Sequence, residues 1–202
     1  MNQKIIDFYE NKHSVGRNNL TFDQVTKLPD ARLEQCHDYI QWLFPLPEQS
    51  RFMRDAPILD RETARRLSSG YSLRVSEAIQ TMMRFWKIDL RLGEDGPATI
   101  KMGQYWMQPE DHNHFRISRV IRFLTLLAED RAKPVLYSDC AERILEVMVK
   151  ANEEKPFATD TTVKFWKKAA QAGWDDYRSY KGRLVVRQVN PADWPYPPEP
   201  EL

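Results

Sequence analysis

The chain has few cysteines, few glycines and no long apolar run. Of its 202 residues, two are cysteine and seven are glycine. Cys36 and Cys140 both lie inside helical patterns, and so sparse a pair indicates reduced thiols in packed positions rather than a disulfide framework. No stretch approaches the roughly 18 apolar residues of a membrane span, and the N-terminus lacks the apolar core of a signal peptide. We therefore expect a cytoplasmic protein without a transmembrane segment.

Excess charge of one sign is also missing. The chain has 30 basic and 29 acidic residues, which leaves a formal net charge of +1. No global field would draw such a protein to nucleic acid or to an anionic lipid surface, so any binding of that kind has to be local.

Catalytic motifs are scarce. The glycines are scattered and form no phosphate-binding loop, and GxSxG, HExxH and paired CxxC motifs do not occur. Cys36 and His37 are neighbours whose side chains diverge by about 100° on a helix, which is poor geometry for a nucleophile and its base. We expect neither an enzyme nor a bound cofactor.

Helical periodicity is what the chain has in abundance. Apolar residues at positions 75, 79, 82, 86 and 90 follow one another at spacings of three or four, as on one face of a helix. Similar patterns lie within residues 3–13, 31–44, 60–69, 113–129, 138–151 and 160–170. Asp60 and Ser138 are the expected N-caps of the helices at residues 60–69 and 138–151. The patterns predict an all-α (mostly α) fold, an irregular bundle of about six or seven helices around a central helix near residues 113–129.

The C-terminal end has a different composition. Residues 191–202 contain five of the thirteen prolines, which favours an extended polyproline II or disordered tail. We therefore predict a helical domain over residues 1–175 and a C-terminal extension with a Pro-rich tail over residues 176–202. Residues 184–186 within the extension have the composition of a short strand.

The predicted helix at residues 31–44 raises a question about one tryptophan. Asp30 is a suitable N-cap, and Pro45 ends the helix. A helical projection places Trp42 between Gln35 and Asp38, away from the apolar face. Either the following turn or the N-terminal helix covers this ring, or Trp42 is an anchor for a binding partner, because Trp is enriched at binding hot spots.

The helix at residues 113–129 raises a second question, about its arginines. Its circumference is mostly apolar, yet Arg116, Arg119 and Arg122 interleave with Phe115 and Phe123. Unpaired buried charges are very costly, so these arginines cannot simply be buried. They pair with carboxylates, lay their stems over aromatic rings, or line a groove that receives an anion.

Two histidines at the start of the same helix, His112 and His114, could suggest a metal site, but their spacing argues against one. His112 and His114 diverge by about 200° if both are helical, and no cysteine or second histidine pair is near them in the sequence. We interpret the segment as a helix cap and first turn, and predict no metal site.

Two segments resemble the signature of the opioid growth factor receptor conserved domain. They are LEQCHDYIQWLFPLPEQS, which begins at Leu33, and HNHFRISRVIRFLTLL, which begins at His112. Asp7-Phe8-Tyr9 is similar to the family's aromatic opening, and the resemblance spans residues 5–170. The signature residues are His37, Tyr39, Ile40, Trp42, Leu43, Phe44, Pro45, Asn113, Arg116, Ile117 and Arg119.

The resemblance implies an all-helical domain without a known catalytic site. The vertebrate member binds an enkephalin peptide and acts in growth control, in association with the nucleus and its membrane, so receptor and membrane labels follow at the family level. The chain resembles a short, single-domain, microbial member, and the family offers no residue-level site to carry across.

Three functional hypotheses follow. The first is a non-enzymatic helical module that binds a peptide or protein through Tyr39, Trp42, Arg116, Arg119 and Arg122. The second is binding of nucleic acid or a phosphate ligand by the same three arginines, which the near-zero net charge disfavours. The third is an enzyme of unrecognised type. The identity of the partner and the oligomeric state do not follow from the sequence.

Overall fold

The structure, a computed structural model, describes most of the helical domain predicted from the sequence. The described residues are 1–50, 53–91, 93, 96–129, 134–171, 173–174, 177–180 and 183–186, the last two ranges as backbone only. The Pro-rich tail predicted at residues 191–202 lies outside them. Within these ranges the chain forms nine helices and two antiparallel pairs of short strands, so the prediction of a mostly α fold is confirmed.

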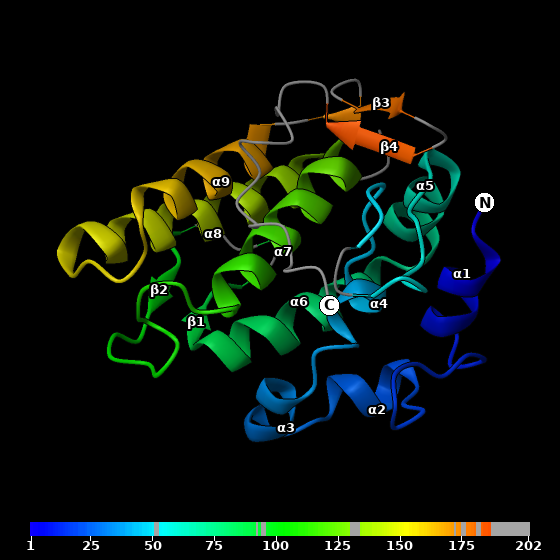
Figure 1. The fold of residues 1–202 in the computed structure, drawn as a ribbon, viewed down its shortest axis with the longest axis horizontal. Helices are drawn as coiled ribbons and strands as arrows, with labels where there is room; N and C mark the ends of the chain where they lie inside the picture. The colour runs from blue at the N-terminus through cyan, green and yellow to red at the C-terminus, as the bar shows by residue number, and fades with distance from the viewer. Residues whose placement is uncertain are drawn as a thin grey trace, which may run out of the picture.

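The helices vary widely in length and are joined by irregular segments (Figure 1). They are α1 (Gln3–Tyr9), α2 (Phe22–Thr26), α3 (Asp30–Gln35), α4 (Ile40–Leu43), α5 (Arg61–Gly70), α6 (Ser72–Trp86), α7 (Asn113–Ala128), α8 (Pro134–Glu154) and α9 (Asp160–Gln171). The strands are β1 (Ile88–Asp89), which pairs with β2 (Thr99–Ile100), and β3 (Tyr177–Tyr180), which pairs with β4 (Arg183–Val186). The strand predicted at residues 184–186 is thus confirmed within β4.

Helix α7 is the central helix, as its composition predicted. It packs against α8 and α9 on one side and against α5 on another, and Figure 1 shows it in the middle of the molecule. Most of its apolar side chains are fully buried, including Ile117, Val120, Phe123 and Leu127, whereas Phe115 and Ala128 are partly exposed. A helix that is apolar on nearly all sides has to lie inside a bundle, because only neighbouring helices can remove such a surface from water.

The prediction of one continuous helix over residues 31–44 is wrong. Helix α3 ends at Gln35, Cys36 is extended (φ −92°, ψ 127°), and α4 begins only at Ile40. In a continuous helix, the Leu33 carbonyl would accept a hydrogen bond from the amide four residues later. Here it accepts from the Tyr39 hydroxyl at 3.1 Å and from the Arg116 guanidinium at 3.2 Å. Side chains distant in sequence thus replace the helical bonds at the break.

Helix starts were predicted with mixed success. Asp60 caps α5 as predicted, since its Oδ1 accepts a hydrogen bond from the Thr63 amide at 2.8 Å. The prediction that Ser138 caps the next long helix is wrong, because α8 already begins at Pro134. Proline is well suited to the first position of a helix, where no intrahelical partner for its nitrogen is needed. In the described part of the chain, no helix is both long and apolar enough to cross a membrane.

Candidate functional site

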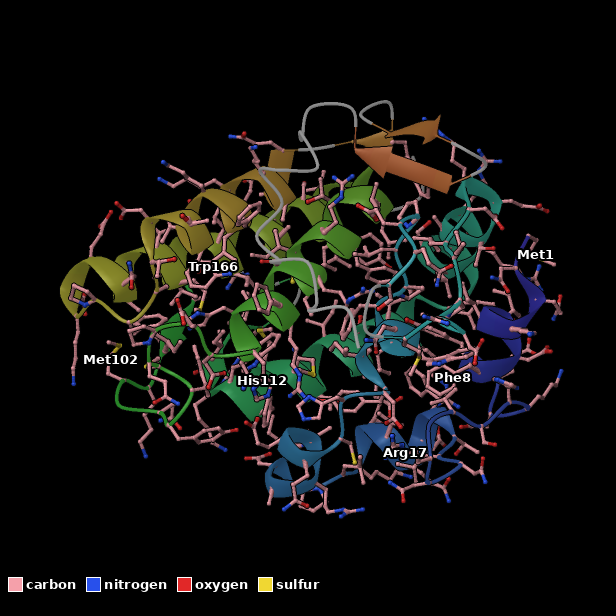
Figure 2. The ribbon with its side chains drawn as sticks, in the orientation of Figure 1. Met1, Phe8, Arg17, Met102, His112 and Trp166 are labelled. Atoms are coloured by element: carbon pink, nitrogen blue, oxygen red, sulfur yellow. The ribbon has the colours of Figure 1, made fainter. Side chains whose placement is uncertain are left out.

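Three segments that are distant in sequence form a polar cluster at one edge of the bundle. We call this cluster the Arg116 platform and define it by its residues, which are Glu34, His37, Tyr105, Asp111, His112, Asn113 and Arg116. They come from the end of α3 and the turn after it, from the loop before α7, and from the first turn of α7. Figure 2 shows His112 where α7 begins, near α3.

Arg116 forms the floor of the platform. Its side chain is only 5% exposed. One terminal nitrogen donates to the Leu33 carbonyl and to Asn113 Oδ1, both at 3.2 Å, and the other donates to the Cys36 carbonyl at 2.9 Å. The guanidinium also lies over the Tyr39 ring, 5.6 Å from its centroid. A buried cation is therefore stabilised largely by carbonyl dipoles at the end of α3, where the helix dipole favours positive charge.

Glu34 is held rigidly at the rim. Its Oε2 accepts hydrogen bonds from the Tyr105 hydroxyl at 3.0 Å and from Asn113 Nδ2 at 3.1 Å, and it lies 3.7 Å from Arg116. Its Oε1 lies 3.3 Å from His112 Nε2. The Glu34 side chain is 27% exposed, so a carboxylate whose position is fixed by several donors remains accessible to solvent.

The two imidazoles of the platform lie next to each other. The ring centroids of His37 and His112 are 4.9 Å apart. Arg116 can only donate, so His37 Nδ1, 3.3 Å from the guanidinium, has to accept, and the ring is neutral with its proton on Nε2. Burial, followed by the charges of Arg116 and His112, lowers the pKa of His37.

Tyr105 is the aromatic part of the rim. The residue is 54% exposed, although its hydroxyl is tied to Glu34. Burial of the hydroxyl end and the hydrogen bond to Glu34 raise the pKa of Tyr105, so it stays a phenol and a donor at neutral pH. Tyr105 therefore presents a ring with a fixed orientation to solvent.

Trp42 does not lie on a solvent-exposed face of its helix. It is 6% exposed and packs against Phe8 of α1, with ring centroids 5.8 Å apart, and against His13, at 4.9 Å. The helical projection failed because the assumed helix is broken at Cys36. Of the alternatives considered from the sequence, coverage by the N-terminal segment is the one found. Tyr39 is also buried, with its hydroxyl on the Leu33 carbonyl.

Arg119 and Arg122 resemble Arg116 in bonding to the main chain. Arg119 donates to the Phe44 carbonyl at 3.0 Å. Arg122 is buried, lies 3.5 Å from the Gly173 carbonyl, and has its Nε 3.8 Å from Glu48. Of the expected partners, carboxylates and aromatic rings are present, as Glu34 and Tyr39 beside Arg116 show. Carbonyls of three different chain segments, which were not expected, are further partners of the three guanidinium groups. A binding role for Tyr39, Trp42, Arg116, Arg119 and Arg122 stays a prediction.

The second histidine of the predicted cap segment has a different environment from the first. His114 is buried, and its ring packs against Trp166, Phe157 and Trp106, with centroids 5.6, 5.8 and 6.4 Å away. Neither ring nitrogen has a hydrogen bond of normal geometry among the described residues. Burial lowers the pKa of His114.

Metal ligation was also considered for these histidines. In the described ranges, no group of three or more His, Cys, Asp or Glu side chains is arranged to hold a metal ion. Asp111 accepts a hydrogen bond from the Asn113 amide at 2.8 Å. The N-cap position of α7 is His112, which makes no side-chain capping bond to a described residue.

Sequence reasoning missed Glu34 and Tyr105 as members of a site. They are 71 residues apart in sequence, and only the fold brings them into contact. The available signal was the position of Glu34 and His112 within the two signature segments, which pointed to those segments but not to their meeting place.

Comparison with known proteins agrees with the family resemblance of the two signature segments. Residues 1–151 match the family model described as the opioid growth factor receptor (OGFr) conserved region. A stretch of 99 residues is 32% identical to the human opioid growth factor receptor (Homo sapiens), and it covers 46% of this chain and 14% of that protein. No solved structure matches the chain.

Proposed function

Because the chain belongs to the opioid growth factor receptor conserved-region family, we propose that it is a non-enzymatic module that binds a peptide or protein partner. The name of the human relative describes a receptor for a growth factor. The chain spans only a small part of that protein, so the proposal concerns peptide or protein binding in general and not opioid peptides. The cytoplasmic location predicted from the sequence stays a prediction.

One observation supports this proposal above the others, namely the rim of the Arg116 platform. Tyr105 exposes more than half of its surface, and its hydroxyl is anchored to Glu34. Aromatic side chains held in one orientation are favourable contacts for a partner, since little conformational freedom is lost on binding. His37 and His112 add hydrogen-bonding groups to the same platform.

The internal hydrogen bonding of the platform favours binding over catalysis. Arg116 donates to carbonyls at the end of α3, and Asn113 bridges Glu34 and Arg116. His37 Nδ1 faces Arg116 and not a nucleophile. The polar atoms beneath the rim thus hold one another in place, which is how a rigid recognition surface is built.

The same arrangement bears on the alternative of phosphate or nucleic-acid binding. Both terminal nitrogens of Arg116 donate to groups of its own domain, and Arg119 donates to the Phe44 carbonyl. A phosphate would have to compete with these bonds. We therefore place the binding face at the rim and not on the arginine row itself.

The test is a selection from a library of random peptides of about twelve residues, a length that suits strand or helix recognition. The intact chain is immobilised, and enriched peptides are then titrated in solution against the wild-type chain and two variants. Tyr105→Ala removes the rim ring. Leu73→Ala is the matched control, because Leu73 is 84% exposed on α6, outside the platform.

We expect Tyr105→Ala to weaken binding by about tenfold, the effect of a modest hot spot, and Leu73→Ala to change it by less than about twofold. A library that yields no peptide with saturable binding would refute the peptide-binding role. Equal effects of the two variants would refute the assignment of the rim.

A further inference from the structure

We propose that the Arg116 platform recognises a lysine side chain of its peptide partner, whose ammonium group binds the Glu34 carboxylate. This inference rests on the proposed function and names the chemical group that the rim selects. Its three supports are the charge that the rim presents, the hydrogen-bonding state of the two carboxylate oxygens, and the exposed ring beside them.

The first support is the placement of charge. The platform contains two carboxylates, Glu34 and Asp111, one guanidinium and two imidazoles. His37 is neutral because its Nδ1 accepts from Arg116, and His112 adds a positive charge only when it is protonated. Arg116 is 5% exposed, whereas the Glu34 side chain is 27% exposed. The positive charge is therefore inside, and a negative charge lies at the surface. A partner that brings a positive charge complements this arrangement, and an anionic one is repelled.

The second support distinguishes an ammonium from a guanidinium. Glu34 Oε2 already accepts from Tyr105 and Asn113 and lies 3.7 Å from Arg116. Among the described residues, the one polar group beside Oε1 is His112 Nε2, at 3.3 Å. A guanidinium fork binds best when both carboxylate oxygens accept, and here only one has that capacity. A compact ammonium needs one accepting oxygen.

The third support is the Tyr105 ring. Its hydroxyl is bonded to the same carboxylate, at 3.0 Å, so the exposed ring begins next to the point where an ammonium would bind. A lysine side chain has a methylene stem that packs on apolar surface and a charged end that interacts with an aromatic face. The rim therefore offers one surface to each part of a lysine side chain.

The experiment uses the intact chain and synthetic peptide arrays of about twelve residues that differ only at the central position. That position is lysine, arginine, acetyl-lysine or norleucine, and a further array has norleucine at the centre and a free α-amino group. Each array is probed with the wild-type chain, with Glu34→Gln and with Glu153→Gln. Glutamine at position 34 keeps an oxygen that accepts from Tyr105 and Asn113, so the variant isolates the charge. Glu153 is an exposed acid on α8 and serves as the control.

We expect lysine peptides to bind at least about fivefold more tightly than acetyl-lysine or norleucine peptides, with arginine in between, and this preference to disappear only in Glu34→Gln. Stronger binding of the free-amine array than of the lysine array would refute the assignment to a side chain. Peptide binding without a lysine preference, or a preference unchanged in Glu34→Gln, would overturn this inference while the proposed function stands. Absence of binding to all arrays and to library peptides would overturn both.

Discussion

Replacing Arg116 by methionine would remove the guanidinium and keep most of the aliphatic stem. Its three shortest hydrogen bonds would be lost, to the carbonyls of Leu33 and Cys36 and to Asn113 Oδ1, together with longer ones to His37 Nδ1 and to the Glu34 carbonyl. Leu33 would still accept from the Tyr39 hydroxyl, but the Cys36 carbonyl has no other hydrogen bond among the described residues. The variant therefore loses several bonds and leaves one buried acceptor without a partner.

The expected cost follows from these contacts. Each bond contributes about 1 kcal/mol net, and an orphaned buried carbonyl costs about 1–2 kcal/mol more. Part of this is returned, because a charge no longer has to be kept away from water. We expect the free energy of unfolding to fall by about 3 kcal/mol, and by about half as much in Arg116→Lys, which keeps the charge but not the fork.

Urea unfolding followed by tryptophan fluorescence measures this cost, since the chain has six tryptophans. With an m-value of about 3 kcal/mol/M, the midpoint should shift by about 1 M. Arg32→Met is the matched control, because Arg32 is exposed and its side chain donates, among the described residues, only to Gln35, three residues later. A change within about 0.5 kcal/mol is expected. A loss below about 1 kcal/mol in Arg116→Met would refute the view that Arg116 completes the end of α3.

Three further outcomes are expected from the same unfolding assay. Trp42→Ala should cost about 3–5 kcal/mol, because the ring is buried, and a cost under about 1 kcal/mol would mean that the ring is largely open to solvent. Gly16→Ala should cost about 1–3 kcal/mol, because Gly16 has φ +72° and an added Cβ would lie 2.6 Å from the Asp38 carboxylate; a neutral result would show that this turn relaxes freely. Stability should be full above about pH 6.5 and decline as the pH falls further, because the pKa of His114 is lowered in the folded state and the unfolded chain takes up the proton first. His114→Leu should reduce this decline and leave the part due to His37, whose pKa is also lowered, and an unchanged pH dependence would contradict the assignment.

The central helix was predictable from the sequence because its signal is local. A helix whose residues are apolar on nearly every side has one stable location, inside a bundle, whatever the rest of the chain does. The prediction that Asp60 caps a helix was also confirmed, because a cap depends on atoms only three residues apart. Such features are decided within one or two turns of chain.

The break between α3 and α4 was not predictable in the same way. The residues from Cys36 to Tyr39 have no proline or glycine, so helical periodicity ran through them without interruption. The chain leaves the helix where Arg116 supplies hydrogen bonds to the Leu33 and Cys36 carbonyls from about 80 residues away in sequence. This one local error placed Trp42 on the wrong face of the predicted helix.

The sequence by itself determined the fold class, the central position of α7 and the need for its arginines to find partners, because burial and the cost of an unpaired charge act on every chain alike. Only the tertiary structure decided which partners those were and where Glu34, Tyr105 and His112 meet. The reason is physical: a carbonyl, unlike a side chain, is the same at every residue, so a sequence does not reveal which carbonyl will face a given guanidinium until the backbone has folded.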